Sequence, residues 1–323
     1  MHSEIRRVVE LDFQKVDNFI IEQLYSEVSL VESIGHYIVD AGGKRMRPLL
    51  VLLAAHSCGI EGDKHISMAA VIEFIHTATL LHDDVVDMST LRRGRPTVNA
   101  EWNNPSSVLV GDFIYSRAFQ LLVKIDNMKI MEIIANTTNK IAEGEVLQLI
   151  EKNNPNTSEE NYMRIIKNKT AILFQAATHC GAILANANSE MTRELRAFGM
   201  HLGVTFQLID DALDYTGNSK DLGKNIGDDL AEGKSTLPLI YAMTNCSIAE
   251  RNLILETLKS KEASQGALDG VLDIVIASGG IKYVEDLAKN EAHAAMKCLN
   301  KLAASEYRHS LEKMVDFSIN RRT

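Results

Sequence analysis

The chain has 323 residues, of which 46% are hydrophobic and only five are proline, a composition typical of a globular protein rich in helix. Its formal net charge of −9 argues against a general nucleic-acid binder, which usually carries a basic balance. The N-terminus lacks a signal-peptide pattern, and the longest apolar run, 49–55, is far shorter than a membrane span. We therefore expect a soluble, cytoplasmic protein that contacts a membrane at most transiently.

Apolar residues recur every three or four positions in most of the chain, which predicts helices. In chain order, the expected helices cover 16–39 (as a pair), 48–57, 67–86, 106–124, 128–150, 160–185, 190–215, a stretch from 238 onward, and a final pair at 267–277 and 281–304. The segments 87–105 and 216–236 collect Gly, Pro, Arg or Asn and are expected to be loops.

No segment alternates with a period of two, and no Pro/Ser-rich linker divides the chain. We predict an all-α protein with one domain over 1–323, a bundle of long helices around a central cavity. The four cysteines are scattered without metal-ligand spacing, which favours free thiols over disulfides or a metal site.

The acidic pattern DDxxD occurs twice, at 83–87 and 210–214, each time after an apolar helical run. Its aspartates are Asp83, Asp84 and Asp87 in the first cluster and Asp210, Asp211 and Asp214 in the second. On a helix these side chains share one arc, where like charges repel and favour a counter-ion. A single acidic triplet is often only a solvated helix face, but two copies in matching contexts indicate a site. Carboxylates without cysteine suit magnesium, which also binds phosphate oxygens.

Basic and polar residues lie close to both clusters in the sequence. Lys44 and Arg47 flank a Gly-rich turn at a helix start, which is a natural anion site. His76 and Gln207 share the helical arcs of the two clusters. The others are Arg92, Arg93, Lys169, Thr170, Lys224 and Lys234. Each alone is more often a solvated side chain, but together they supply enough positive charge to bind a second diphosphate without metal.

These motifs closely resemble those of the long-chain trans-polyprenyl diphosphate synthases, and within them the bacterial octaprenyl enzymes. The matching blocks are GGKRMRP (42–48), FIHTATLLHDDVVD (74–87), RRGRPTVN (92–99), LVGDFIYSRAF (109–119), IAEGEVLQL (141–149), NKTAILF (168–174) and FQLIDDALDYTGNSKDLGKNIGDDLAEGKSTLPL (206–239). The final 75 or so residues resemble the family only in helical character.

The resemblance implies a role for each matching residue. Asp83, Asp87 and Asp210 would ligate magnesium, about two or three ions in all, with Asp84, Asp211 and Asp214 in support. The diphosphate of isopentenyl diphosphate would be held by Lys44, Arg47, His76 and Arg93. The allylic diphosphate, farnesyl diphosphate by expectation, would be held by Arg92, Lys169, Thr170, Gln207, Lys224 and Lys234.

The chemistry implied is repeated head-to-tail condensation to a long all-trans polyprenyl diphosphate, octaprenyl by expectation, for a quinone side chain. Ala78 and Thr79, one turn before Asp83, are small, and in the family small residues here let the chain grow. Two alternatives stay open at this point, a class I terpene cyclase and a non-catalytic subunit of a heteromeric synthase. Long apolar helices, such as 106–124, and the resemblance both favour a homodimer.

Overall fold

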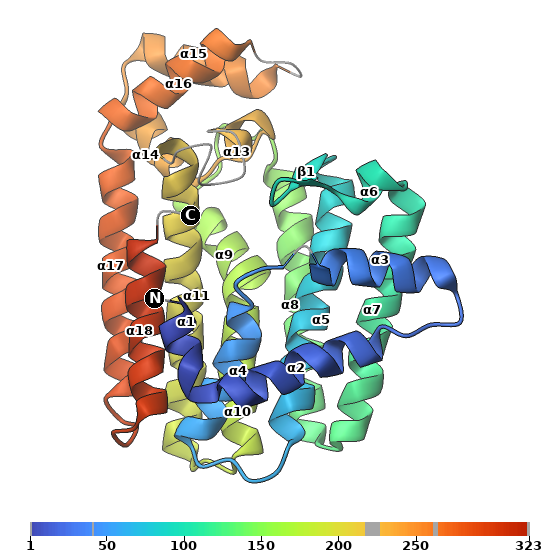
Figure 1. Cartoon of the computed structure of the whole chain (residues 1–323). Coiled ribbons are helices and arrows are strands. Elements are labelled where there is room, and N and C mark those ends of the chain that lie inside the picture. The colour runs from blue at the N-terminus through green and yellow to red at the C-terminus, as the bar shows by residue number, and fades with distance from the viewer. Residues whose placement is uncertain (1, 41, 217–226, 261–263, 322–323) are drawn as a thin grey trace. The chain divides into compact units, whose positions relative to one another are not determined.

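A computed structural model describes residues 2–40, 42–216, 227–260 and 264–321 of the chain (Figure 1). These residues gather into two compact units. The first comprises Met1–Thr138, Leu173–Gly199 and Ala295–Phe317, and the second comprises Asn139–Ile172, Met200–Ala294 and Ser318–Thr323. That the whole chain forms one domain around a central cavity stays a prediction.

The all-α prediction is confirmed. The helices up to the first acidic cluster are α1 (His2–Arg6), η1 (Arg7–Val9), α2 (Glu10–Gln23), α3 (Ser29–Asp40), α4 (Met46–Ser57) and α5 (Lys64–Val86). A hairpin of β1 (Leu91–Arg92) and β2 (Arg95–Pro96) precedes α6 (Val98–Glu101), α7 (Asn104–Ile125), α8 (Met128–Glu151), α9 (Glu159–Ile166), η2 (Lys167–Ala171) and α10 (Ile172–Leu184). The rest are α11 (Ser189–Thr216), α13 (Asp228–Ala231), α14 (Leu237–Asn245), α15 (Ile248–Lys259), α16 (Gln265–Ala277), α17 (Gly280–Leu299) and α18 (Glu306–Asn320).

Helix α4 lies in the core of the first unit. Its run from Leu49 to Ala55 has no exposed surface, as expected of a helix that is apolar on every side. Helix α5 packs against α2, α4 and α7, and most of its apolar side chains are buried as well. Among the described residues, no helix combines the length and the apolar character needed to cross a membrane.

The second unit has two apolar clusters. One joins Tyr162, Val204, Leu208 and Val284, and the other is built around Tyr215. Local capping explains several helix starts in the chain. Ser158 accepts a hydrogen bond from the backbone N–H of Asn161, and Ser247 begins a reciprocal capping box at α15.

The observed elements differ from the sequence expectation in several places. The predicted helix 160–185 is interrupted by η2, a turn of π-helix. The segment 87–105 contains the short hairpin and α6 rather than loop alone. Helix α7 begins at Asn104, two residues early, because Asn103 caps it and Pro105 fits the first turn. The final pair of helices is followed by a further helix, α18.

Candidate functional site

The first acidic cluster lies at the C-terminal end of α5. Asp84 is only 3% exposed, and the guanidinium of Arg92 donates to its carboxylate from Nη2 at 2.6 Å and from Nε at 2.9 Å. Burial raises the pKa of Asp84, and the Arg92 charge opposes that shift. The hairpin that follows α5 carries Arg92, so it anchors the middle aspartate. Asp83 and Asp87 remain half-buried on either side of it.

The Gly-rich turn before α4 lies against Arg93. Arg93 Nη1 donates to the carbonyl of Gly42. Gly43 has a φ of +144°, a backbone conformation that residues with a Cβ atom rarely adopt. Glycine is therefore favoured at 43 by its backbone conformation, and the absence of a side chain leaves room for the Arg93 guanidinium. Lys44, which is exposed on the same turn, has its Nζ 5.3 Å from the ring centroid of Phe317.

Arg47 and His76 form a pair in the first unit. Arg47 Nη1 lies 3.1 Å from His76 Nε2, and the guanidinium lies 4.6 Å from the ring centroid of Phe174. Arginine can only donate, so Nε2 accepts and the ring proton is on Nδ1. Burial, together with the charges of Arg47 and Arg93, holds the pKa of His76 well below its usual value. His76 is therefore a neutral donor that can add no charge to an anion.

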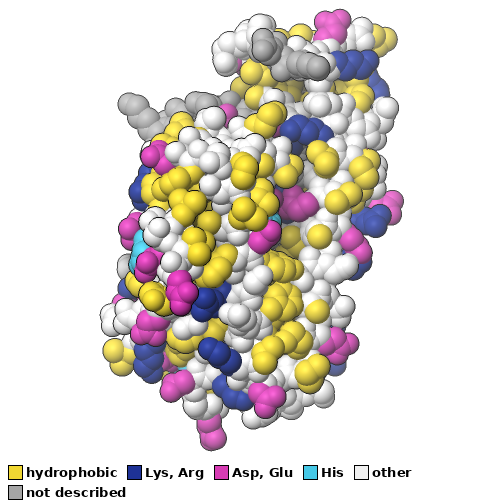
Figure 2. All heavy atoms as spheres, turned by 90° about the vertical axis from the view of Figure 1, so that its right-hand side faces the viewer, with side chains coloured by type: hydrophobic (Ala, Val, Ile, Leu, Met, Phe, Trp, Pro, Cys, Tyr) yellow, Lys and Arg dark blue, Asp and Glu magenta, His cyan; other side chains and the backbone are white. Residues whose placement is uncertain are grey.

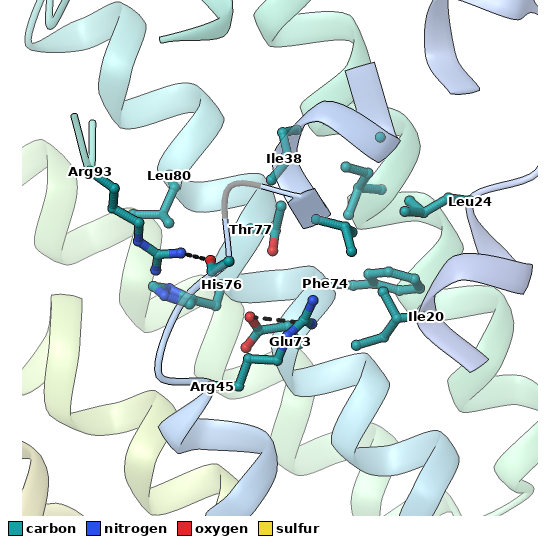
Figure 3. Close-up of a pocket in the computed structure, with 14 residues that line it drawn as sticks. Ile20, Leu24, Ile38, Arg45, Glu73, Phe74, His76, Thr77, Leu80 and Arg93 are labelled. Carbon is teal, nitrogen blue, oxygen red and sulfur yellow. Dashed lines mark hydrogen bonds and ion pairs between the residues drawn. The ribbon is translucent and has the colours of Figure 1, made fainter. Parts of the chain in front are cut away.

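A pocket opens beside His76, as Figure 3 shows. Arg45 in its wall forms ion pairs with Asp17 at 3.3 Å and with Glu73 at 3.8 Å. The sequence reasoning did not include Glu73, although it precedes His76 by three residues and shares its helical face. Burial raises the pKa of Glu73, while the charge of Arg45 opposes the shift.

The small residues predicted to control chain length are on α5 near this pocket. The pocket wall takes His76, Thr77 and Leu80 from α5, but not Ala78. Ala78 has no exposed surface, and the hydroxyl of Thr79 donates to the carbonyl of His76 at 2.8 Å. Their role in chain length therefore stays a prediction.

The second acidic cluster lies near the C-terminal end of α11. Asp211 is 3% exposed and accepts hydrogen bonds from the Tyr162 hydroxyl at 2.5 Å and from Gln207 Nε2 at 2.7 Å. Burial, followed by the charge of Asp229, raises the pKa of Asp211 to about 7. Asp214 is also buried and accepts from the backbone N–H of Asp229 at 3.3 Å. Tyr162 and Asp229 were not identified from the sequence, since both are distant from the motif along the chain.

Asp210, the first residue of this cluster, is half-buried and contacts the end of the chain. Arg321 Nη2 donates to Asp210 Oδ1 at 2.9 Å and to the carbonyl of Phe206 at 2.8 Å. The guanidinium also lies 3.8 Å from the Phe206 ring centroid. Arg321 was not predicted from the sequence, because the C-terminal segment carries no recognisable motif.

The residues predicted to hold an allylic diphosphate partly surround the second cluster. Lys169 and Thr170 lie in the π-helical turn η2, a feature often found at functional sites. Lys169 Nζ donates to Glu145 at 2.6 Å, and the Thr170 hydroxyl donates to Gln207 Oε1 at 2.9 Å. Lys234 pairs with Glu232. Lys224 lies outside the described residues.

The two clusters share one arrangement that fits a metal site. Their middle aspartates, Asp84 and Asp211, are buried and held by protein donors, whereas Asp83, Asp87 and Asp210 are half-buried. In each cluster an anchored middle carboxylate fixes the end of its helix, and in the second cluster Asp210 also pairs with Arg321. Carboxylate oxygens are hard donors, so each cluster suits magnesium or another hard divalent cation.

Comparisons with known proteins agree with these features. A sequence model of the family described as Polyprenyl synthetase matches residues 28–275. The chain is 48% identical to the octaprenyl diphosphate synthase of Haemophilus influenzae, a match that covers 99% of this chain and 97% of that protein. It is 49% identical to the all-trans-nonaprenyl-diphosphate synthase (geranyl-diphosphate specific) of Rhodobacter capsulatus, covering 99% and 98%. It also matches the crystal structure of polyprenyl synthase from Caulobacter crescentus complexed with calcium and isoprenyl diphosphate, at a TM-score of 0.97, 41% identity, and 100% and 98% coverage.

Proposed function

Because this chain belongs to the polyprenyl synthetase family, we propose that it condenses isopentenyl diphosphate with an allylic diphosphate in repeated head-to-tail steps that end at octaprenyl diphosphate. Long-chain trans-polyprenyl diphosphate synthesis is its activity, since relatives with that activity match nearly its whole length. The observation that carries the site assignment is the pattern of anchored middle aspartates beside half-buried outer ones.

The basic residues of the first unit would hold isopentenyl diphosphate. Arg47, oriented by His76 and by the ring of Phe174, offers a charged and directional donor. His76 is neutral with its proton on Nδ1, so it would donate without adding charge. Lys44 and Arg93 extend the positive charge along the Gly-rich turn. We assign these four residues to one diphosphate.

The condensation then breaks the allylic C–O bond, and the electron pair leaves with the diphosphate. The double bond of isopentenyl diphosphate supplies the pair for the new C–C bond, and loss of a proton restores an alkene. When bound, about two or three magnesium ions would neutralise charge on the departing diphosphate. Asp83, Asp87 and Asp210 are the residues we propose to hold them. Lys169, Arg92, Thr170, Gln207, Lys224 and Lys234 are proposed to orient the allylic diphosphate.

The product length and the primer are the finer parts of the proposal. Relatives at nearly equal identity are named as octaprenyl and nonaprenyl synthases, so overall identity does not separate the two lengths. The small side chains of Ala78 and Thr79 favour a long product. Farnesyl diphosphate is the proposed primer, and geranyl diphosphate is the competitor to test, because one relative is named as specific for it.

Neither alternative reading is favoured by the comparisons. A terpene cyclase needs no second diphosphate site, whereas here Lys44, Arg47, His76 and Arg93 are all present. A non-catalytic subunit would be expected to lose aspartates, and both clusters are complete. The matched relatives are named as synthases over nearly their full length.

We also propose that the enzyme is a cytoplasmic homodimer. Figure 2 shows hydrophobic side chains gathered on the face that lies to the right in Figure 1, where α7 runs. Leu109 and Val123 on α7 are 65% and 69% exposed, and a contiguous exposed apolar patch is typical of a protein–protein interface. Light scattering on the purified protein measures the mass directly. A monomer at assay concentration would contradict this part of the proposal.

The deciding experiment is a product assay with the purified chain, magnesium, labelled isopentenyl diphosphate, and either farnesyl or geranyl diphosphate. We expect chains that end at octaprenyl. Asp83→Asn and Asp210→Asn should each lower the rate by about two to three orders of magnitude, as for lost transition-state charge stabilisation. The control is Asp273→Asn, an exposed aspartate of α16.

Three other results of this assay would each contradict a different part of the proposed function. Cyclic hydrocarbons from an allylic diphosphate alone would indicate a cyclase. A folded wild-type chain without activity would indicate that a partner subunit is required. Full activity in the Asp210→Asn variant would remove that residue from the metal site.

A further inference from the structure

A further group of metal-ligating side chains lies in the first unit, far from the first acidic cluster. Asp12 of α2, His56 of α4 and His65 of α5 direct one potential ligand atom each to a common point, and these atoms lie within 4.8 Å of one another. Asp12 Oδ2 is 2.7 Å from His56 Nε2 and 2.9 Å from His65 Nε2. Asp83 follows His65 by 18 residues on the same helix, a rise of roughly 27 Å.

The three side chains are held in place before any ligand arrives. His56 stacks on Tyr307 with ring centroids 4.9 Å apart, and it meets His65 edge-on at 5.2 Å. Lys15 takes the other carboxylate oxygen, Asp12 Oδ1, at 3.0 Å and so does not occupy the common point. Such fixed orientation lowers the entropy cost of binding a ligand.

The two ring nitrogens of His65 have different surroundings. The side chain is 3% exposed, Nε2 lies against Asp12, and Nδ1 has no hydrogen-bond partner among the described residues. Nε2 is therefore the nitrogen that the site can use as a ligand.

The site is open to solvent at two of its three side chains. With 15% of Asp12 and 24% of His56 side-chain surface exposed, an ion has a route to the site from solvent.

We propose that Asp12, His56 and His65 form a second metal site, for zinc or a related transition-metal ion, that joins α2, α4 and α5. Two imidazole nitrogens and one carboxylate suit zinc, cobalt or nickel better than magnesium. Zinc bonds of about 2.0–2.1 Å in a tetrahedron require ligand atoms about 3.3 Å apart. The carboxylate–imidazole distances need to open by only about half an ångström.

Binding also sets a proton requirement and a limit on affinity. Without metal, Nε2 of each histidine carries the proton and donates it to Asp12. With metal bound to Nε2, the ring proton is on Nδ1 instead, so a neutral histidine releases no proton to solvent when the metal binds. In His65 this Nδ1–H would still lack an acceptor among the described residues. Loss of such a supporting hydrogen bond typically weakens metal binding about 10–100-fold. We therefore expect moderate rather than very tight affinity.

The test uses untagged protein stripped with a chelator and then held in saturating magnesium, which occupies hard-donor sites. Cobalt is titrated in while its visible absorption is recorded, and zinc is then added as competitor. We expect one equivalent of cobalt with low-symmetry nitrogen–oxygen coordination, displacement by zinc, and a higher melting temperature. His56→Gln and Asp12→Asn should each weaken binding at least tenfold, about the effect of losing even an outer-shell partner.

The matched control is His201→Gln, because His201 also contacts a carboxylate, that of Glu291 at 2.6 Å, but among the described residues no second histidine joins them to form a three-ligand group. Its cobalt titration should equal that of wild type. No cobalt uptake by the folded wild-type protein would overturn the proposal, as would equal uptake by His56→Gln. A strong thiolate absorption band would assign the ion to nearby Cys58 and overturn it too. None of these readouts depends on prenyl transfer.

Discussion

Gly144→Ala is expected to destabilise the protein even though alanine is the better helix former. Gly144 is in the interior of α8, where the substitution alone would gain up to about 1 kcal/mol. An added Cβ would lie 2.9 Å from the backbone nitrogen of Lys169, 3.0 Å from Asn168 Cβ and 3.2 Å from the Asn168 carbonyl carbon. Two of these three atoms belong to the backbone of η2 and cannot move aside alone.

The cost of this overlap decides the sign. Forcing a methyl group into a packed contact typically costs about 1–3 kcal/mol, more than the helix propensity returns. Gly270→Ala in α16 is the matched control, because its Cβ would meet only the end of the Leu253 side chain, at 3.2 Å. We therefore expect Gly144→Ala to be less stable than Gly270→Ala by about 1–3 kcal/mol.

Urea unfolding followed by circular dichroism measures both variants against wild type. The turnover of Gly144→Ala should also fall, because η2 carries Lys169 and Thr170. If Gly144→Ala matches or exceeds the stability of Gly270→Ala, the close packing of α8 on η2 is wrong. If stability falls but turnover per folded molecule is unchanged, η2 does not position the proposed allylic-site residues.

Three further substitutions test separate features. Tyr162→Phe removes a hydrogen-bond donor from buried Asp211 and should lower the free energy of unfolding, measured in urea, by about 1–3 kcal/mol. The control Tyr283→Phe removes only a half-exposed hydrogen bond to Glu159 and should lower it far less. For His179, burial first and then the charges of Arg196 and Lys129 lower the pKa to about 4. Below the ordinary histidine pKa of 6.5, the folded state therefore binds fewer protons than the unfolded state, so the stability of the fold decreases as the pH is lowered from 6.5 to 4. His179→Gln should make this decrease smaller by about 1–2 kcal/mol, a figure reduced because the side chain is partly exposed. An identical pH profile in the variant would contradict this. Ala78→Tyr should shorten the products in the chain-length assay, and an unchanged ladder would show that Ala78 does not face the growing chain.

Long helices could be predicted from this sequence because their burial follows the three- and four-residue period. The helix expected at 190–215 is observed at Ser189–Thr216, and the helix expected from residue 160 begins at Glu159, capped by Ser158. The interruption at η2 could not be predicted, since the close approach of Gly144 that accompanies it is a tertiary contact. Helix α18 was missed because 306–320 is more polar than the other long helices.

The two acidic clusters show where a repeated motif stops being informative. Both read DDxxD, and in both the middle aspartate is buried, but the donors that hold it differ completely: Arg92 in one, Tyr162 and Gln207 in the other. The last aspartates differ as well. Asp87 is half-buried at the end of α5, whereas Asp214 is buried within α11, and its carbonyl accepts from the backbone N–H of Gly227.

Helix ends explain this difference. Helix α5 stops at Val86, so Asp87 is its C-cap residue: its backbone N–H still donates to the carbonyl of Asp83, but the helix does not continue past it. Helix α11 continues to Thr216, so Asp214 is still inside its helix and supports the segment that carries Asp229. The same DDxxD motif thus has two half-buried aspartates, Asp83 and Asp87, in the first cluster, and one, Asp210, in the second. Because of this asymmetry, we expect Asp87→Asn to act mainly on magnesium-dependent activity and Asp214→Asn to act mainly on stability. When each loss of activity is divided by the loss of unfolding free energy in the same variant, the ratio should be larger for Asp87→Asn.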